Sequence, residues 1–276
     1  MSSWAIVGAT RGIGFEYVKQ LSSDSENTVI ALIRSQATAG PLNELAATRK
    51  NIHIIETDIS SLSRLEETAN SISKVTNGSL DVLVYNAYFS GTGEAKMLPP
   101  SALERLIASS RGKEDVFKRE VDESLAVNLF QLVYTINALL PLVENGRQKK
   151  IVYISSGIGD IPTTRATEMP NLLGYSVSKG AGNLIIAKYA VDLKAKGIRT
   201  LAMSPGWVET DASRGISSSP QAFQWMLSSF QKMDPRVKGM ISTEESVTAQ
   251  LSVIGSLDEK LSGAFVSHRG NDKDWF

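Results

Sequence analysis

Short, almost entirely apolar runs alternate with longer amphipathic segments along this chain of 276 residues. Two of the runs read VLV at 82–84 and IVYI at 151–154. Runs this apolar are typical of central parallel strands, which are covered on both faces. Strands that alternate with helices are joined by right-handed crossovers. The sequence therefore predicts one α/β domain over residues 1–276, a Rossmann fold whose doubly wound, seven-stranded parallel sheet carries helices on both faces.

The hydrophobic pattern also predicts where the elements lie. Two segments, 89–111 and 211–238, do not fit the alternation, and both follow strands that should end at the edge of the sheet where such folds bind ligands. We expect substrate loops over about 157–174 and 211–240. The expected strands are 4–7, 28–33, 52–56, 81–86, 150–155, 198–203 and 263–267, and the expected helices are 12–21, 42–48, 62–75, 115–140, 175–196 and 243–254.

Composition narrows the classes of function. The chain has 29 basic and 29 acidic residues, so its net charge is zero. This balance argues against nucleic acid or an anionic membrane as a main partner. It has no cysteine and only two histidines, His53 and His268, which excludes thiolate sites and argues against a metal site or a Ser-His-Asp hydrolase. The N-terminal residues lack a basic segment, and no apolar run approaches about 18 residues. We expect a soluble protein of the cytoplasm.

Three glycines follow the first expected strand and lead into the first expected helix. Gly8, Gly12 and Gly14 would let the backbone turn tightly and bring a pyrophosphate close to the free N–H groups of the helix N-terminus. Glycines also mark plain turns, but this position between strand and helix favours a dinucleotide site.

Charged residues near this loop bear on which dinucleotide is bound. The second strand ends at Arg34 without the acid that usually binds the ribose diol of NAD, and Arg11 lies inside the glycine loop. Two guanidiniums suit the 2′-phosphate of NADP(H), which is therefore the predicted cofactor; the alternative is that both are solvated surface arginines. Asp58, after the third strand, would contact the adenine ring or serve as a turn or helix cap.

A second set of residues points to proton transfer. Tyr175 and Lys179 lie four residues apart and share a helix face, so the ammonium is expected to lower the pKa of the phenol from about 10 toward the working range. Ser155 and Ser156 end the fifth strand, where one hydroxyl would polarise a carbonyl. Asn128 sits in an apolar helix and is either a structural cross-brace or part of a water-linked proton path.

These motifs, in this order, resemble the short-chain dehydrogenase/reductase family. The resemblance implies that Tyr175 is the general acid/base, that Ser156 orients the substrate carbonyl, and that Lys179 holds the nicotinamide ribose, while Asn128 binds a water that passes protons to Lys179. The cofactor-binding residues implied by the motifs and by Arg34 are Gly8, Thr10, Arg11, Gly12, Ile13, Gly14, Arg34, Asp58, Ile59, Asn86, Tyr175, Lys179, Pro205, Gly206, Val208 and Thr210.

Within the family, the chain resembles fungal and sniffer-type carbonyl reductases, among them reductases of polyketide ketones. It departs from the family pattern at Tyr88, where a glycine is usual, so an aromatic ring is expected near the pocket. The segment between Ser156 and Tyr175 is also longer than is common. Apolar residues after the sixth strand, such as Trp207 and Phe230, would pack a helix onto the body or form a lid over the substrate.

The sequence thus predicts an NADPH-dependent reductase of a hydrophobic or aromatic ketone or aldehyde, a homodimer or homotetramer with a small-molecule carbonyl substrate. We expect the substrate to be an intermediate of secondary metabolism. Two alternatives remain at this point. One is an enzyme of dehydration, epimerisation or cyclisation on the same fold, and the other is a non-catalytic regulator that binds NADP(H).

Overall fold

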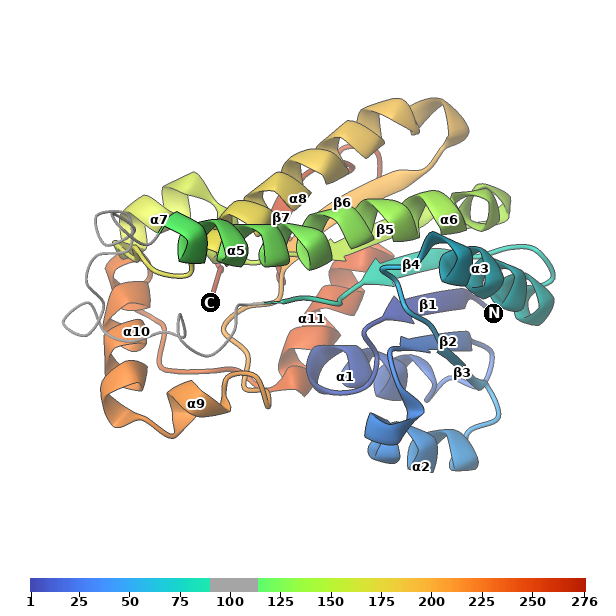
Figure 1. Ribbon diagram of the computed structural model, residues 1–276, viewed down its shortest axis with the longest axis horizontal. Coiled ribbons are helices and arrows are strands. Elements are labelled where there is room, and N and C mark those ends of the chain that lie inside the picture. The colour runs from blue at the N-terminus through green and yellow to red at the C-terminus, as the bar shows by residue number, and fades with distance from the viewer. Residues whose placement is uncertain (90–113) are drawn as a thin grey trace.

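The computed structural model describes residues 1–89 and 114–276, which form an α/β fold around one sheet (Figure 1). Seven strands pair in the order β3-β2-β1-β4-β5-β6-β7, and every pairing is parallel. The predicted fold class is confirmed, and every predicted strand is present with its ends shifted by at most two residues. The strands are β1 (Ser3–Val7), β2 (Thr28–Ile33), β3 (Ile52–Glu56), β4 (Val82–Tyr85), β5 (Lys150–Ile154), β6 (Arg199–Ser204) and β7 (Phe265–Ser267).

Helices connect the strands. Two predicted helix ends are wrong. The helix expected over 115–140 continues to Asn145, with Pro141 inside it, because Leu142 and Val143 beyond the proline are buried in the core. The helix expected over 175–196 ends at Asp192 and is followed by a separate 3₁₀ turn, η5 (Lys194–Lys196). Asn128 lies in a π-helical turn, η3 (Ala126–Phe130), within this run. The α-helices are α1 (Gly12–Leu21), α2 (Gly40–Thr48), α3 (Leu62–Thr76), α5 (Glu114–Leu125), α6 (Gln131–Asn145), α7 (Ile161–Thr167), α8 (Leu173–Asp192), α9 (Arg214–Ser217), α10 (Pro220–Met233) and α11 (Thr243–Gly255).

Alternating strand residues build a core on each face of the sheet. Along β1, Trp4 and Ile6 face α1, α2 and α11, whereas Ala5 and Val7 face α3, α6 and α8. Figure 1 shows these two helical layers on opposite sides of the sheet. Because successive strand residues point to opposite faces, an uninterrupted apolar run satisfies both layers.

One helical run among the described residues, Glu114–Asn145, has the length and apolar composition of a membrane-spanning helix. The core helix of a folded domain meets the same criteria. In this structure α6 packs against α3, and α5 packs against α8. Part of the apolar surface of this run is therefore used in packing within the domain, while Phe117 and Phe130 remain exposed.

The strand order reverses between β1 and β4, and the crevice outside the carboxyl ends of these strands is where doubly wound sheets bind ligands. The glycine loop follows β1, and Asn86 and Tyr88 follow β4. A third apolar cluster, which includes Trp207, Met226 and Phe230, lies beside this edge. The predicted substrate loops build part of it, since 157–174 contains α7 and 211–240 contains α9 and α10.

Candidate active site

The glycine loop closes tightly between β1 and α1. Gly8 and Gly12 have φ angles of +80° and +56°, in the region that favours glycine. A Cβ on Gly8 would lie 2.9 Å from the Cα of Ala87, and one on Gly14 would lie 2.1 Å from the Gly8 carbonyl oxygen. The Asn86 amide donates to that same carbonyl at 3.2 Å. The loop is thus held in one shape by contacts that tolerate no side chain at Gly8 or Gly14.

This loop fits a dinucleotide. The Arg11 side chain at the N-cap makes no capping hydrogen bond among the described residues, so the first N–H groups of α1 remain open to an anion. A Cβ on Gly12 would lie 3.5 Å from Cγ2 of Thr210, which places the glycine loop next to the segment after β6. A pyrophosphate bound at the N-terminus of α1 would therefore lie close to Thr210.

The carboxyl ends of β2 and β3 carry the residues predicted to contact the adenosine end. Arg34 is exposed at the end of β2, and Asp58 is exposed after β3. Hydrogen bonds from Ser60 hold the pKa of Asp58 below its usual value, and the positive charge of Arg34 lowers it further. Asp58 thus stabilises a turn by its hydrogen bonds with Ser60, and Arg34 lies close enough to interact with it electrostatically.

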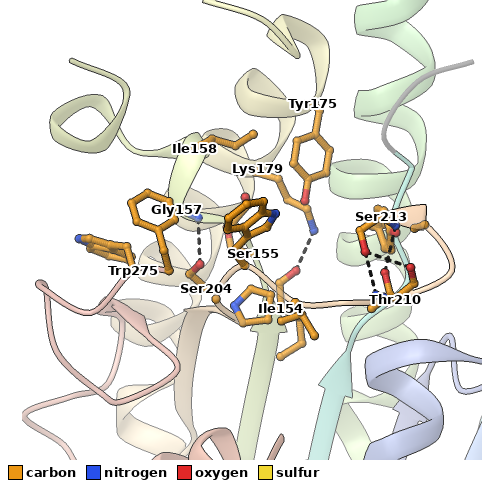
Figure 2. Close-up of a pocket in the computed structure, with 18 of the residues that line it drawn as sticks. Ile154, Ser155, Gly157, Ile158, Tyr175, Lys179, Ser204, Thr210, Ser213 and Trp275 are labelled. Atoms are coloured by element: carbon orange, nitrogen blue, oxygen red, sulfur yellow. Dashed lines mark hydrogen bonds between the residues drawn. The ribbon is translucent and has the colours of Figure 1, made fainter. Parts of the chain in front are cut away.

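A cavity opens at the carboxyl ends of β4, β5 and β6 (Figure 2). Of the predicted site residues, eight line it: Asn86, Ser156, Tyr175, Lys179, Pro205, Gly206, Val208 and Thr210. The other predicted cofactor residues, which lie in or near the glycine loop and at the ends of β2 and β3, are not among its lining: Gly8, Thr10, Arg11, Gly12, Ile13, Gly14, Arg34, Asp58 and Ile59.

The catalytic candidates meet at this cavity. Tyr175 and Lys179 lie one turn apart on α8, and Figure 2 shows both side chains directed toward the end of β5. The Lys179 ammonium donates to the Ile154 carbonyl at 2.7 Å and lies 5.7 Å from the centre of the Tyr175 ring. Ser156, just beyond β5, lies close enough to Tyr175 to lower the pKa of its phenol. Two elements of the chain, α8 and the end of β5, thus converge on one phenol.

The pKa of the phenol differs from the expectation. Burial raises the pKa of Tyr175 above its ordinary value, and the neighbouring Tyr88 adds to this, while the hydrogen bond with Ser156 works in the opposite direction. Burial also lowers the pKa of Lys179 from 10.5 to about 7. Desolvation therefore outweighs the ammonium effect that the spacing of the two residues predicts, because both side chains are withdrawn from water.

The structure separates the two serines at the end of β5. The Ser155 hydroxyl is buried and donates to Oδ1 of Asn183 on α8 at 2.5 Å. Ser156 is less buried and lines the cavity beside Tyr175. Both serines line the cavity, but the Ser155 hydroxyl is bonded to α8, which leaves the Ser156 hydroxyl for a ligand.

Asn128 is fully buried and braces the site from behind. Its amide nitrogen donates to the Phe89 carbonyl at 2.8 Å and to Ser178 at 2.9 Å, and its oxygen accepts from the Phe89 N–H at 2.9 Å. Its backbone carbonyl accepts from Tyr153 at 3.2 Å. Of the two roles open from the sequence, these side-chain contacts match the cross-brace, and the water-linked path stays a prediction.

Two cavity residues from the C-terminal end carry no signal in the local sequence, whereas Trp207 and Phe230 belong to the apolar segment expected near the substrate. Trp275 and Phe276 line the cavity from the far end of the chain, and Phe276 stacks on Phe230 with ring centres 3.9 Å apart. Trp207, between Phe223 and Phe230, has a buried indole N–H without a partner in the described part of the chain. This N–H is a donor available to a bound molecule.

Comparison with known proteins agrees with this architecture. The short chain dehydrogenase family model matches residues 3–221. The chain is 45% identical over 275 residues to the short-chain dehydrogenase/reductase atnB of Arthrinium sp., with 100% of both chains covered. It is 36% identical over 277 residues to the short-chain dehydrogenase/reductase AacuF of Aspergillus aculeatus, again with 100% of both covered.

A solved structure is similar over the same extent. The carbonyl reductase Sniffer of D. melanogaster superposes with a TM-score of 0.76 at 26% identity, and 100% of each chain is covered. The similarity to these proteins extends over the whole chain. It therefore includes the parallel sheet, the glycine loop after β1 and the segment of α8 with Tyr175 and Lys179. This chain belongs to the short-chain dehydrogenase/reductase family of oxidoreductases.

Proposed function

We propose that this protein is an NADPH-dependent reductase that converts a ketone or aldehyde to an alcohol. The observation that carries the proposal is the Tyr175 phenol, with Ser156 beside it and Lys179 one turn further along α8, at the wall of one cavity. The similarity to the carbonyl reductase Sniffer supports the same reaction class.

The residues suggest how the reaction proceeds. When bound, the reduced nicotinamide supplies the hydride. The hydroxyls of Ser156 and Tyr175 donate hydrogen bonds to the carbonyl oxygen, and Tyr175 delivers the proton as negative charge develops there. A raised pKa keeps this phenol protonated at neutral pH, which suits a proton donor in reduction. Lys179, with a pKa near 7, exchanges protons in the same range and returns one to Tyr175.

Two positively charged side chains, Arg11 and Arg34, support a preference for NADPH over NADH. Arg34 follows β2 where enzymes that prefer NAD have an acid, and Arg11 occupies the N-cap position of α1. Both guanidiniums are exposed, so they are accessible to a 2′-phosphate and would bind it by charge-assisted hydrogen bonds.

The walls of the cavity favour an apolar substrate. Aromatic and aliphatic side chains surround the few hydroxyls at its base, as is typical of sites that bind hydrophobic molecules. The apolar lining residues include Tyr88, Ile158, Leu172, Trp207, Val208, Ile216, Met226, Phe230, Trp275 and Phe276.

The test is NADPH consumption. We expect the purified protein to oxidise NADPH with at least one member of a panel of aromatic, quinone and alicyclic carbonyls. Tyr175→Phe should lower the rate by roughly 10² to 10⁴, as loss of a general acid does. Tyr189→Phe is the matched control, since Tyr189 lies on the same helix and bonds to Asn137 instead. Tight NADPH binding without consumption across the panel would contradict the proposal and favour a non-catalytic binder.

We also propose that the protein assembles as a homodimer or homotetramer. Val177, Leu184 and Val191 recur every seven residues along α8 and are exposed. Phe117, on the adjacent α5, is exposed as well. Such a run of exposed apolar side chains on neighbouring helices is typical of an interface.

A further inference from the structure

Tyr88 is held in place by the backbone on both sides of it. On one side, Asn86 donates to the Gly8 carbonyl at 3.2 Å. On the other, both backbone groups of Phe89 bond to the buried side chain of Asn128, at 2.9 and 2.8 Å. The fold therefore determines where the Tyr88 side chain lies, at the carboxyl end of β4.

From this position the Tyr88 ring lies next to the catalytic candidates. Its centre is 6.3 Å from that of the Tyr175 ring, and the two planes meet at 68°, an edge-to-face contact. The Lys179 ammonium lies 5.9 Å from the Tyr88 centroid. Tyr88 lines the cavity, and yet 45% of the residue remains exposed.

The other aromatic rings of the cavity are paired differently. Trp207 and Phe276 both pack against Phe230, with centroids at 5.1 and 3.9 Å. Trp275 packs against Phe265 at 4.8 Å. In the described part of the chain, Tyr88 has Tyr175 as its one aromatic partner. Tyr88 thus offers a large exposed ring surface beside the phenol that would protonate the substrate.

We propose that Tyr88 is a specificity-determining residue whose ring packs on an aromatic ring joined directly to the reacting carbonyl, so that the site prefers aryl ketones to alicyclic ketones. The inference rests on the proposed function, because the Tyr175 and Ser156 hydroxyls define where the carbonyl oxygen lies. A ring attached to that carbonyl lies within a few ångströms of Tyr175 and hence beside Tyr88. Aromatic pairs in proteins contribute enough beyond buried area to change affinity about 2- to 12-fold.

The experiment compares two ketones of similar shape, α-tetralone and its saturated counterpart α-decalone. Their dissociation constants are measured by calorimetry on the protein saturated with NADP⁺, which prevents turnover. We expect the wild type to prefer α-tetralone. Tyr88→Leu should reduce this preference about 2- to 12-fold, whereas Tyr88→Phe should retain it because the ring is kept. The affinity for NADP⁺ should stay the same in both variants.

Five results would overturn the inference. The wild type could bind both ketones equally or bind neither. Tyr88→Leu could weaken both ketones by the same factor, which would indicate a plain apolar wall. Tyr88→Phe could lose as much preference as Tyr88→Leu, which would assign the effect to the hydroxyl. Either variant could weaken NADP⁺ itself, which would place the ring against the cofactor.

The proposed function is tested separately by NADPH consumption in the wild type. If the wild type binds α-tetralone by way of Tyr88 but consumes no NADPH with any carbonyl, the reductase proposal fails while the calorimetric preference remains. If the wild type reduces both ketones and Tyr88→Leu leaves their ratio unchanged, only the role of Tyr88 fails.

Discussion

The buried ammonium of Lys179 predicts a pH-dependent effect on stability. The side chain is 1% exposed, and burial lowers its pKa from 10.5 to about 7. Between these pH values the unfolded chain binds more protons at this position than the folded chain does. The free energy of unfolding of the wild type therefore rises with pH in this window, because the folded state is penalised less as the lysine becomes neutral.

Lys179→Met removes this contribution and keeps a side chain of similar length. Integrating the difference in proton binding from pH 7 to pH 9 gives about 2 kcal/mol, since the slope approaches about 1.4 kcal/mol per pH unit once the folded-state lysine is neutral. The free energy of unfolding of the variant minus that of the wild type should thus fall by about 2 kcal/mol from pH 7 to pH 9. Loss of the hydrogen bond to Ile154 adds an offset without changing this sign.

Urea unfolding followed by tryptophan fluorescence at pH 7, 8 and 9 measures the difference. Groups that titrate alike in both proteins cancel in it. Lys188→Met is the control, because it removes an exposed lysine from the same helix. A Lys179→Met difference that stays constant or increases with pH would refute the argument that burial depresses this pKa.

Two further predictions concern the cofactor and the serine pair. Arg34→Asp should weaken NADPH binding about 10- to 100-fold and NADH binding much less, because a charge-assisted contact with the 2′-phosphate is lost, and equal effects in a fluorescence titration would remove Arg34 from the phosphate site. Ser156→Ala should lower kcat about 10²- to 10³-fold by removing a donor to the developing oxyanion. Ser155→Ala should instead lower stability by about 1 to 2 kcal/mol, because Asn183 loses its partner, and similar kcat losses in the two variants would contradict the division of roles.

Much of the fold follows from local pattern. Fully apolar runs such as 151–154 belong to buried parallel strands, and the strand boundaries shifted by at most two residues. The helix expected over 115–140 extended past Pro141 because burial of the following turn outweighs the loss of one hydrogen bond. Gly263 shows a further limit, since its positive φ of +84° delays the start of β7 to Phe265.

The candidate site was predictable where a motif lies on a single element. The Tyr175–Lys179 spacing puts both on one face of α8, and the glycines between β1 and α1 mark the loop directly. The C-terminal Trp275 and Phe276 are placed at the cavity by contacts with residues distant in sequence. No local sequence pattern therefore predicts their position.

By itself, the sequence determined the alternation of elements, the glycine loop and the residues on which a dinucleotide and a carbonyl would depend, because these properties need only the order and spacing of side chains. The tertiary structure decided their environment. It assigned the Ser155 hydroxyl to Asn183 and Ser156 to the cavity, and it set Tyr88 against Tyr175. It also reversed the expected shift of the phenol pKa, because desolvation depends on everything packed around a group and not on one neighbour four residues away.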